Sequence, residues 1–319
     1  MSELRSTQGF SLVELLISTS LLLIGIAIVS TALLQITSSQ KTIWNRTEMH
    51  SGIRGATELM QQEVGQAGRV TLPSRVTLNT AVTGVSPCVT PVTVAVTSVS
   101  GTATAEMFVN ESLTVLDGDN QESVRLTAVP SGTQITACFT RNHAPGAVLA
   151  PLGGFATGIV PPTGIANGSS ATVLKMYGDI NGDGHMVYVE YTCDTAAHNL
   201  YRSVMAFDAA PPKSPVTSSQ ILLGNILDNP GGTPCFTYQT STVTVDTTPP
   251  TPLTFVLDVA VTLTVQTQQV DPLTKTFQTE TKALLNVSPR NVFNAWSMAG
   301  IGYTDRVQPI PPSVVSLLP

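Results

Sequence analysis

The sequence predicts an α+β protein in which one long N-terminal helix precedes a β-rich domain. An almost unbroken apolar run covers residues 10–36, and helix-like spacing of apolar residues continues to about Gly68. Val/Thr-rich segments separated by Gly, Pro, Asn and Asp then fill residues 70–297. We expect the first half of the helix to cross a membrane and the second half to pack on the β-rich domain.

The apolar run contains a single charged residue, Glu14. The run exceeds the roughly 20 residues that a membrane-spanning helix needs. A carboxylate in hydrocarbon costs several kcal/mol unless it is paired, so an acid at this place indicates a function. Residues 1–9 form a short polar leader with Arg5, and a cut before the apolar run would leave the helix on the mature protein, unlike an ordinary secretory signal.

Cleavage after Gly9 would supply a partner for Glu14. Phe10 would become the new N-terminus, with an α-amino group of pKa about 7.7–8.0. That cation can meet Glu14 of a neighbouring copy or related subunit and cancel both charges in the membrane. Glu14 is therefore predicted to act in assembly.

The exported half of the helix is predicted over residues 37–69. Apolar residues recur there mostly at helical spacing among Arg, Glu and Gln, and the first proline of the chain is Pro73. A helix from Phe10 to about Gly68 would be roughly 90 Å long at 1.5 Å per residue.

The β-rich domain is expected over residues 70–297, and the alternation of Val259, Val261, Leu263 and Val265 marks its clearest half-buried strand. Strands are predicted at Thr90–Val99, Ser123–Val129, Gln134–Thr140, Met186–Tyr191, Thr254–Thr267 and Thr276–Val287. Residues 298–319 contain four prolines and are expected to form a flexible tail, with a docking strand as the alternative.

The four cysteines all follow the apolar run, and no CxxC motif is present. An even number in an exported domain predicts two disulfides, for which three connectivities are possible. Sequence order favours the more local pairing, Cys88–Cys138 and Cys193–Cys235.

An acidic segment at residues 179–190 fits the calcium-loop pattern D-x-[DN]-x-[DN]-G-x5-E. The predicted ligands are Asp179, Asn181, Asp183, the carbonyl of His185, and Glu190. A strand is expected directly after the turn, which favours the first three ligands over Glu190. The alternative is an Asn-Gly/Asp-Gly turn that caps a hairpin without metal.

Composition and motifs argue against several other functions. The net charge is −6 and only 11% of residues are charged, so no nucleic-acid partner is expected. The sequence has no HExxH, no G-x-S-x-G and no Gly-rich phosphate loop, and we predict that the protein is not an enzyme.

The stretch Gly9-Phe10-Ser11-Leu12-Val13-Glu14 resembles the signal of type IV pilins and pseudopilins, Gly-Phe-(Ser/Thr)-Leu-(Ile/Val)-Glu, at all six positions. The resemblance implies a pilin-like fold and a prepilin peptidase that cuts between Gly9 and Phe10 and methylates Phe10. It also implies a single-pass bacterial inner-membrane protein, with its leader in the cytoplasm, that later reaches the periplasm or the surface pilus.

Further stretches are similar to the PilW-type minor pilins. Residues 54–68 are also similar to J-type pseudopilins and end in the shared (Asp/Glu)-(Ile/Val)-x-x-Ala-Gly pattern. The order of the others along the chain agrees with PilW: Leu200–Ser203, Ile221–Tyr238 and Pro289–Asn291.

These similarities imply a minor pilin of a type IV pilus, in an initiating or tip complex with other pilins. One alternative is a J-type pseudopilin of type II secretion, whose exported domain is usually smaller. Another is an adhesive module displayed on a pilus.

Overall fold

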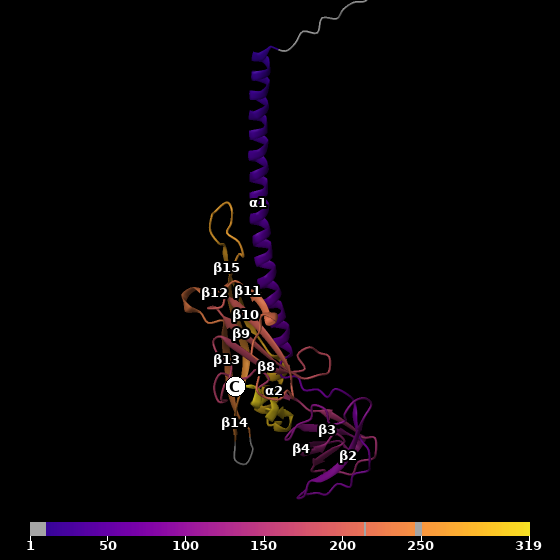
Figure 1. Cartoon of the computed structure of the whole chain (residues 1–319). Helices are drawn as coiled ribbons and strands as arrows, with labels where there is room; N and C mark the ends of the chain where they lie inside the picture. Colours follow the sequence, from indigo (N-terminus) through magenta and orange to yellow (C-terminus); the bar gives the residue numbers. More distant parts are fainter. Residues whose placement is uncertain (1–10, 214, 246–250) are drawn as a thin grey trace, which may run out of the picture. The chain divides into compact units, whose positions relative to one another are not determined.

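The computed structural model describes residues 11–213, 215–245 and 251–319, and its chain forms two compact units. The first unit combines Met1–Ser51 with Gln266–Thr279, and the second combines Gly52–Val265 with Glu280–Pro319. The long helix α1 is continuous from Leu12 to Gln66 (Figure 1), so its residues belong to both units. The α+β layout expected from the sequence is confirmed: one long apolar helix followed by a β-rich region.

Within the second unit, α1 buries one stripe of small and medium apolar side chains. Ile53, Ala56, Met60, Val64 and Ala67 are each at most 2% exposed and recur every three or four residues. This spacing places them on one helix face, whose burial from water stabilises the packed helix.

The helix ends where the chain must turn back sharply. Gly68 has a φ of +82°, which favours glycine, and its N–H donates to the carbonyl of Tyr177 at 2.9 Å. A Cβ at Gly68 would lie 2.8 Å from Cγ2 of Val292, so the close approach of the chain also requires glycine here.

The first β structure after the helix is a closed antiparallel barrel with strand order β1-β2-β5-β4-β3-β6. Its interior holds Leu113, Val115, Leu126 and Ile135, all fully buried. Residues 70–297 were expected to form one β-rich region, and the separate barrel is not predicted by the sequence. Its strands are β1 Val76–Leu78, β2 Val92–Ser98, β3 Ser112–Leu116, β4 Glu122–Ser131, β5 Gln134–Ala137 and β6 Val148–Pro151.

An antiparallel sheet of four strands follows, in the order β11-β10-β9-β8. Its strands are β8 Val173–Gly178, β9 Val187–Asp194, β10 Asn199–Ala206 and β11 Ile221–Gly224. β9 and β10 form an eight-residue hairpin register, from Asn199 opposite Asp194 to Ala206 opposite Val187.

A further sheet is built around the long strand β14, Thr251–Gln266. β12 (Ile226–Leu227) and β13 (Phe236–Val245) pair antiparallel with β14, and β15 (Thr279–Val287) pairs with it as well. This strand contains the alternation that the sequence marked most clearly, with Val259, Val261, Leu263 and Val265 all buried.

Both predicted disulfides are confirmed in their pairing. Cys88 bonds to Cys138 and Cys193 bonds to Cys235, with Cα–Cα distances of 5.7 and 6.5 Å. The second bond joins β9 to the residue just before β13, and so links the two four-stranded sheets.

The expectation of a loose tail over residues 298–319 is wrong. The segment continues from α2 (Arg290–Gly300) through β16 (Val307–Gln308), which pairs parallel with β7 (Gly154–Phe155), to α3 (Pro312–Leu317). Apolar residues between its prolines are buried, Val314 and Leu317 completely, and proline is compatible with the first turn of a helix. The amide of Gln308 bonds to both backbone groups of Ser112, which ties the segment to the barrel.

Candidate assembly site on the N-terminal helix

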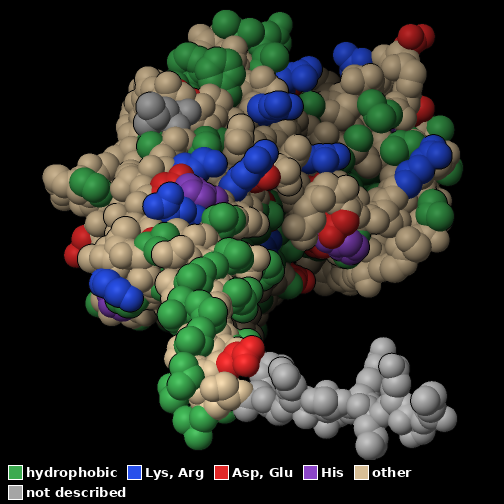
Figure 2. All heavy atoms as spheres, turned by 90° about the horizontal axis from the view of Figure 1, so that it is seen from above, with side chains coloured by type: hydrophobic (Ala, Val, Ile, Leu, Met, Phe, Trp, Pro, Cys, Tyr) green, Lys and Arg blue, Asp and Glu red, His purple; other side chains and the backbone are tan. Residues whose placement is uncertain are grey.

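The apolar half of α1 is exposed along its whole length. Its large hydrophobic side chains range from 77% exposed at Leu12 to 52% at Ile26. Figure 2 looks onto this end of the helix and shows hydrophobic side chains gathered over it. Within the described residues, α1 is the one helix long and apolar enough to cross a membrane. Such a surface needs a lipid or protein neighbour to cover it.

Several hydroxyl groups inside this apolar half donate to carbonyls of the helix itself. Ser18, Ser20 and Thr31 donate to the carbonyls four residues earlier at 2.7–2.8 Å. Hydrocarbon offers no hydrogen bonds, so internal pairing of this kind suits a membrane-spanning helix.

Glu14 differs from these hydroxyls because its charge needs an external partner. It lies in the first turn of α1, where a negative charge suits the helix dipole. Within the part of the chain that the structure describes, the Glu14 carboxylate has no ion-pair partner. The predicted processing residues Gly9 and Phe10 lie outside the described residues.

A buried ion pair anchors the other half of the helix. Glu63, 4% exposed, accepts hydrogen bonds from Arg202 Nε at 3.0 and 3.1 Å and from the Tyr191 hydroxyl at 2.5 Å. Burial raises the pKa of Tyr191 above its ordinary value, so the hydroxyl keeps the proton that it donates. Removing one partner of such a pair leaves an uncompensated buried charge.

This pair joins two stretches that the sequence singled out only by resemblance. Glu63 comes from the (Asp/Glu)-(Ile/Val) pattern at the end of α1, and Arg202 comes from the Leu200–Ser203 hairpin. A third such stretch meets the same helix end, because Asn291 Nδ2 donates to the carbonyl of Gln66 at 3.0 Å. Their convergence was not predicted, since the three stretches are far apart in the sequence.

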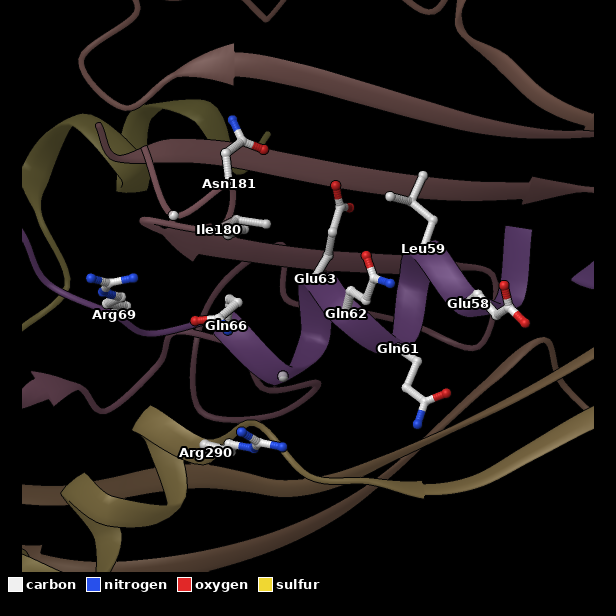
Figure 3. A pocket seen from close by; sticks show the side chains of 12 residues that line it. Glu58, Leu59, Gln61, Gln62, Glu63, Gln66, Arg69, Ile180, Asn181 and Arg290 are labelled. Carbon is white, nitrogen blue, oxygen red and sulfur yellow. The ribbon is translucent and has the colours of Figure 1, made fainter. Parts of the chain in front are cut away.

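A polar pocket of about 760 Å³ lies beside this helix end. Figure 3 shows Gln61, Gln62 and Gln66 on α1, with Arg69 after the helix and Arg290 at the start of α2. The lining is mainly polar and of mixed charge, which does not define a ligand class.

The five predicted calcium ligands do not share one site. Asp179 is fully buried with its Oδ2 3.5 Å from Arg69 Nε, and Asp183 Oδ1 accepts from the backbone N–H of His185 at 2.9 Å. Glu190 lies on β9 and accepts from Lys213 Nζ at 2.7 Å. Across residues 11–213, 215–245 and 251–319, no three His, Cys, Asp or Glu side chains form a metal-binding group.

One feature of the acidic turn still suits a cation. Both carboxylate oxygens of Asp179 are buried without a hydrogen-bond partner. Calcium binding therefore stays a prediction that concerns Asp179, Asn181 and Asp183, while the geometry does not support Glu190.

The side chain of His185 points to a different partner. Its Nδ1 lies 2.9 Å from Oε1 of Glu106, and this hydrogen bond raises the pKa of His185 above its usual value. Glu106 Oε2 also accepts from the backbone N–H of Met186 at 2.7 Å. These bonds tie the end of the β8–β9 hairpin to the segment that carries Glu106.

Comparison with known families identifies one motif, at the N-terminus of the chain. Residues 4–30 match the family described as the prokaryotic N-terminal methylation motif. The chain carries the type IV prepilin signal. Comparison with curated proteins and with solved structures gives no significant match.

The match begins within the polar leader, at residue 4, and extends over most of the exposed apolar half of α1, including Glu14. This signal supports a pilin or pseudopilin, a class of structural subunits. The signal and the apolar helix together fit anchoring in a membrane.

Proposed function

We propose that the protein is a minor pilin, a structural subunit of a complex that initiates or caps a type IV pilus. The observation that carries the proposal is the prepilin signal at the start of an exposed apolar helix, whose one carboxylate, Glu14, has no ion-pair partner among the described residues. After cleavage by a prepilin peptidase, the amino group of Phe10 in one subunit pairs with Glu14 in its neighbour. The apolar halves of the helices pack side by side, while the β-rich regions face outward.

The convergence of Glu63, Arg202 and Asn291 at the end of α1 supports a PilW-like subunit within this class. These residues lie in three stretches that resemble PilW-type minor pilins, and each contacts the helix end or its partner. Their role is to hold the exported half of the helix on the sheets, so that force on the helix reaches the folded domain.

A J-type pseudopilin of type II secretion is the second candidate, because the same signal and helix stretch occur in both classes. The large β-rich region, with its additional barrel, favours the pilus. The third candidate, an adhesive module, would use surfaces of the barrel or sheets at a pilus tip.

Deletion of the gene tests the proposal directly. We expect loss of surface pili, counted by electron microscopy of sheared filaments, with secretion of exoproteins unchanged. Restoration by the intact gene, and no restoration by a Glu14→Leu copy, would link the phenotype to the helix. Normal piliation with lost secretion would favour the pseudopilin, and normal values of both would reject an assembly role.

A further inference from the structure

The segment between β14 and β15, residues 267–278, forms an ordered loop beside α1 within the first unit. Asp271 is its centre: it is 2% exposed and its Oδ1 accepts from the Thr42 hydroxyl of α1 at 2.7 Å. Arg46 of α1 bonds to Gln278 at the other end of the loop. The loop is therefore fixed to the helix at two places.

Internal bonds give the loop one defined conformation. Asp271 Oδ1 accepts from the N–H of Leu273 at 2.8 Å, and the Asp271 carbonyl accepts from the N–H of Lys275 at 2.8 Å. The N–H of Thr267 donates to the carbonyl of Gln278 at 2.8 Å, which closes the base of the loop. The loop exposes the polar side chains of Gln268, Gln269, Thr274, Lys275 and Thr276, together with three apolar ones.

Three of the exposed side chains of the loop are large and apolar. Val270, Leu273 and Phe277 are 45%, 58% and 46% exposed, and on the neighbouring helix Ile43 and Trp44 are 65% and 73% exposed. Single exposed apolar residues are common, but a group of them marks a surface that meets a partner.

The loop lies at the level where the apolar half of α1 ends. Gln268 and Gln269 line the same pocket as Thr37, the first residue after the apolar run, and as Trp44. Thr42 follows Ile36 by about 9 Å along the helix. The headgroup layer adds roughly 5–8 Å to each side of a hydrocarbon core of about 30 Å. With Ile36 at the edge of the core, Thr37 beside Gln268 and Gln269 falls within this layer, and Thr42 beside Asp271 lies at its outer boundary.

The polar residues of this region also suit a lipid surface. Lys41 and Lys275 are exposed, and their ammonium groups can approach phosphate headgroups. Tryptophan concentrates at membrane interfaces, where Trp44 would stand.

We infer that residues 267–278 insert Val270, Leu273 and Phe277 into the headgroup layer of the bilayer, as a second membrane contact beside α1. The inference rests on the membrane anchoring that belongs to the proposed function. It goes beyond that function because it assigns a lipid-binding surface to the β-rich part of the chain.

Spin labels on single introduced cysteines in the full chain, reconstituted into vesicles of phosphatidylethanolamine and phosphatidylglycerol, test this contact. The native cysteines are paired in disulfides. Labels are placed at Leu273, at Leu23 in the apolar half of α1, and at Val99 of the second unit, which is 81% exposed. The ratio of collisions with oxygen to collisions with a nickel chelate measures lipid contact.

We expect ratios at Leu23 and Leu273 several-fold above the ratio at Val99. Asp271→Ala should release the loop and lower the Leu273 ratio toward the Val99 value, while the Leu23 ratio stays unchanged. An aqueous label at Leu273 beside a lipid-exposed label at Leu23 would overturn the inference and leave the anchor intact. An aqueous label at Leu23 would overturn both the inference and the membrane anchor. A ratio at Leu273 that rises only after addition of a second pilin would also overturn the inference, because the loop would then contact another subunit and not the bilayer.

Discussion

Glu14 is the residue whose chemistry most directly tests subunit assembly. Replacing it by leucine removes the one charge of the apolar half of α1, so insertion into the membrane should be unchanged or better. The neighbour's amino group then has no partner, and loss of one member of a buried pair costs about 3–5 kcal/mol. We expect co-purification of partner pilins with Glu14→Leu to fall by at least tenfold.

Glu48→Leu is the matched control for this prediction. Glu48 is an exposed glutamate on the same helix, beyond the apolar half. Its loss should leave co-purification unchanged. Wild-type yield of partner pilins with Glu14→Leu would contradict the pairing with Phe10.

Asp183 tests the calcium prediction in the acidic turn. If Asp179, Asn181 and Asp183 bind calcium only in the folded state, a hundredfold excess over Kd stabilises the protein by about 2.7 kcal/mol. The melting temperature should then rise in millimolar calcium relative to chelator, and Asp183→Ala should abolish the rise. Equal melting temperatures in both buffers would leave the hydrogen-bonded turn as the whole role of this segment.

At the scale of elements, the contact between α1 and the β9–β10 hairpin depends on Glu63. Glu63→Ala leaves Arg202 without its partner and should lower the free energy of unfolding by about 3–5 kcal/mol. Urea unfolding of the full chain in detergent measures the change. Glu58→Ala, on an exposed part of the same helix where the glutamate pairs with the exposed Arg54, should cause no measurable loss.

The barrel contains a carboxylate that makes its stability depend on pH. Burial alone would raise the pKa of Glu122, but hydrogen bonds from Thr140, His143 and Arg141 outweigh burial and lower the pKa below 4.5. A lowered pKa in the folded state means that Glu122 stabilises the barrel above pH about 4.5 and loses this contribution as the pH falls further.

Hydrogen–deuterium exchange over residues 122–141 should therefore accelerate below pH about 4.5, after correction for the intrinsic rate. Glu122→Gln should remove most of this pH dependence. Asp119→Asn, at an exposed acid just before the strand, should retain it. The same pH dependence in Glu122→Gln as in the wild type would show that another group is responsible.

The elements that the sequence predicted are those with a local signal. Helix α1 was predictable from apolar spacing without proline, and β14 from the alternation around Val261. Strands β2, β4 and β5 of the barrel were also predicted, but the short strands β1, β3 and β6, the closure of the barrel and the packing of residues 298–319 were not, because short strands and prolines carry little local signal. These parts are held in place by contacts between residues far apart in the sequence, such as Gln308 with Ser112.

The candidate site likewise contains residues that the sequence predicts and residues that only the fold brings together. Glu14 was found from one charge in an apolar run, which is visible in the sequence alone. The pairing of Glu63 with Arg202 needed the fold, since 139 positions separate the two residues. The calcium pattern was misleading for Glu190 because a strand, which follows the turn, directs that residue toward Lys213.

At the scale of the whole molecule, the order of leader, helix and β-rich region predicts the N-terminus of the mature protein after cleavage. The cut is expected between Gly9 and Phe10, before the apolar run, so the mature chain keeps its anchor. Edman sequencing and mass spectrometry of carbonate-washed membranes should find an N-terminus at Phe10, methylated on its amino group. Gly9→Val should leave the precursor uncut, because the bulkier side chain blocks the peptidase, while the protein still remains in the membrane fraction. A wild-type protein that begins at Met1, or beyond residue 36 and free of the membrane, would contradict both the processing and the assembly role.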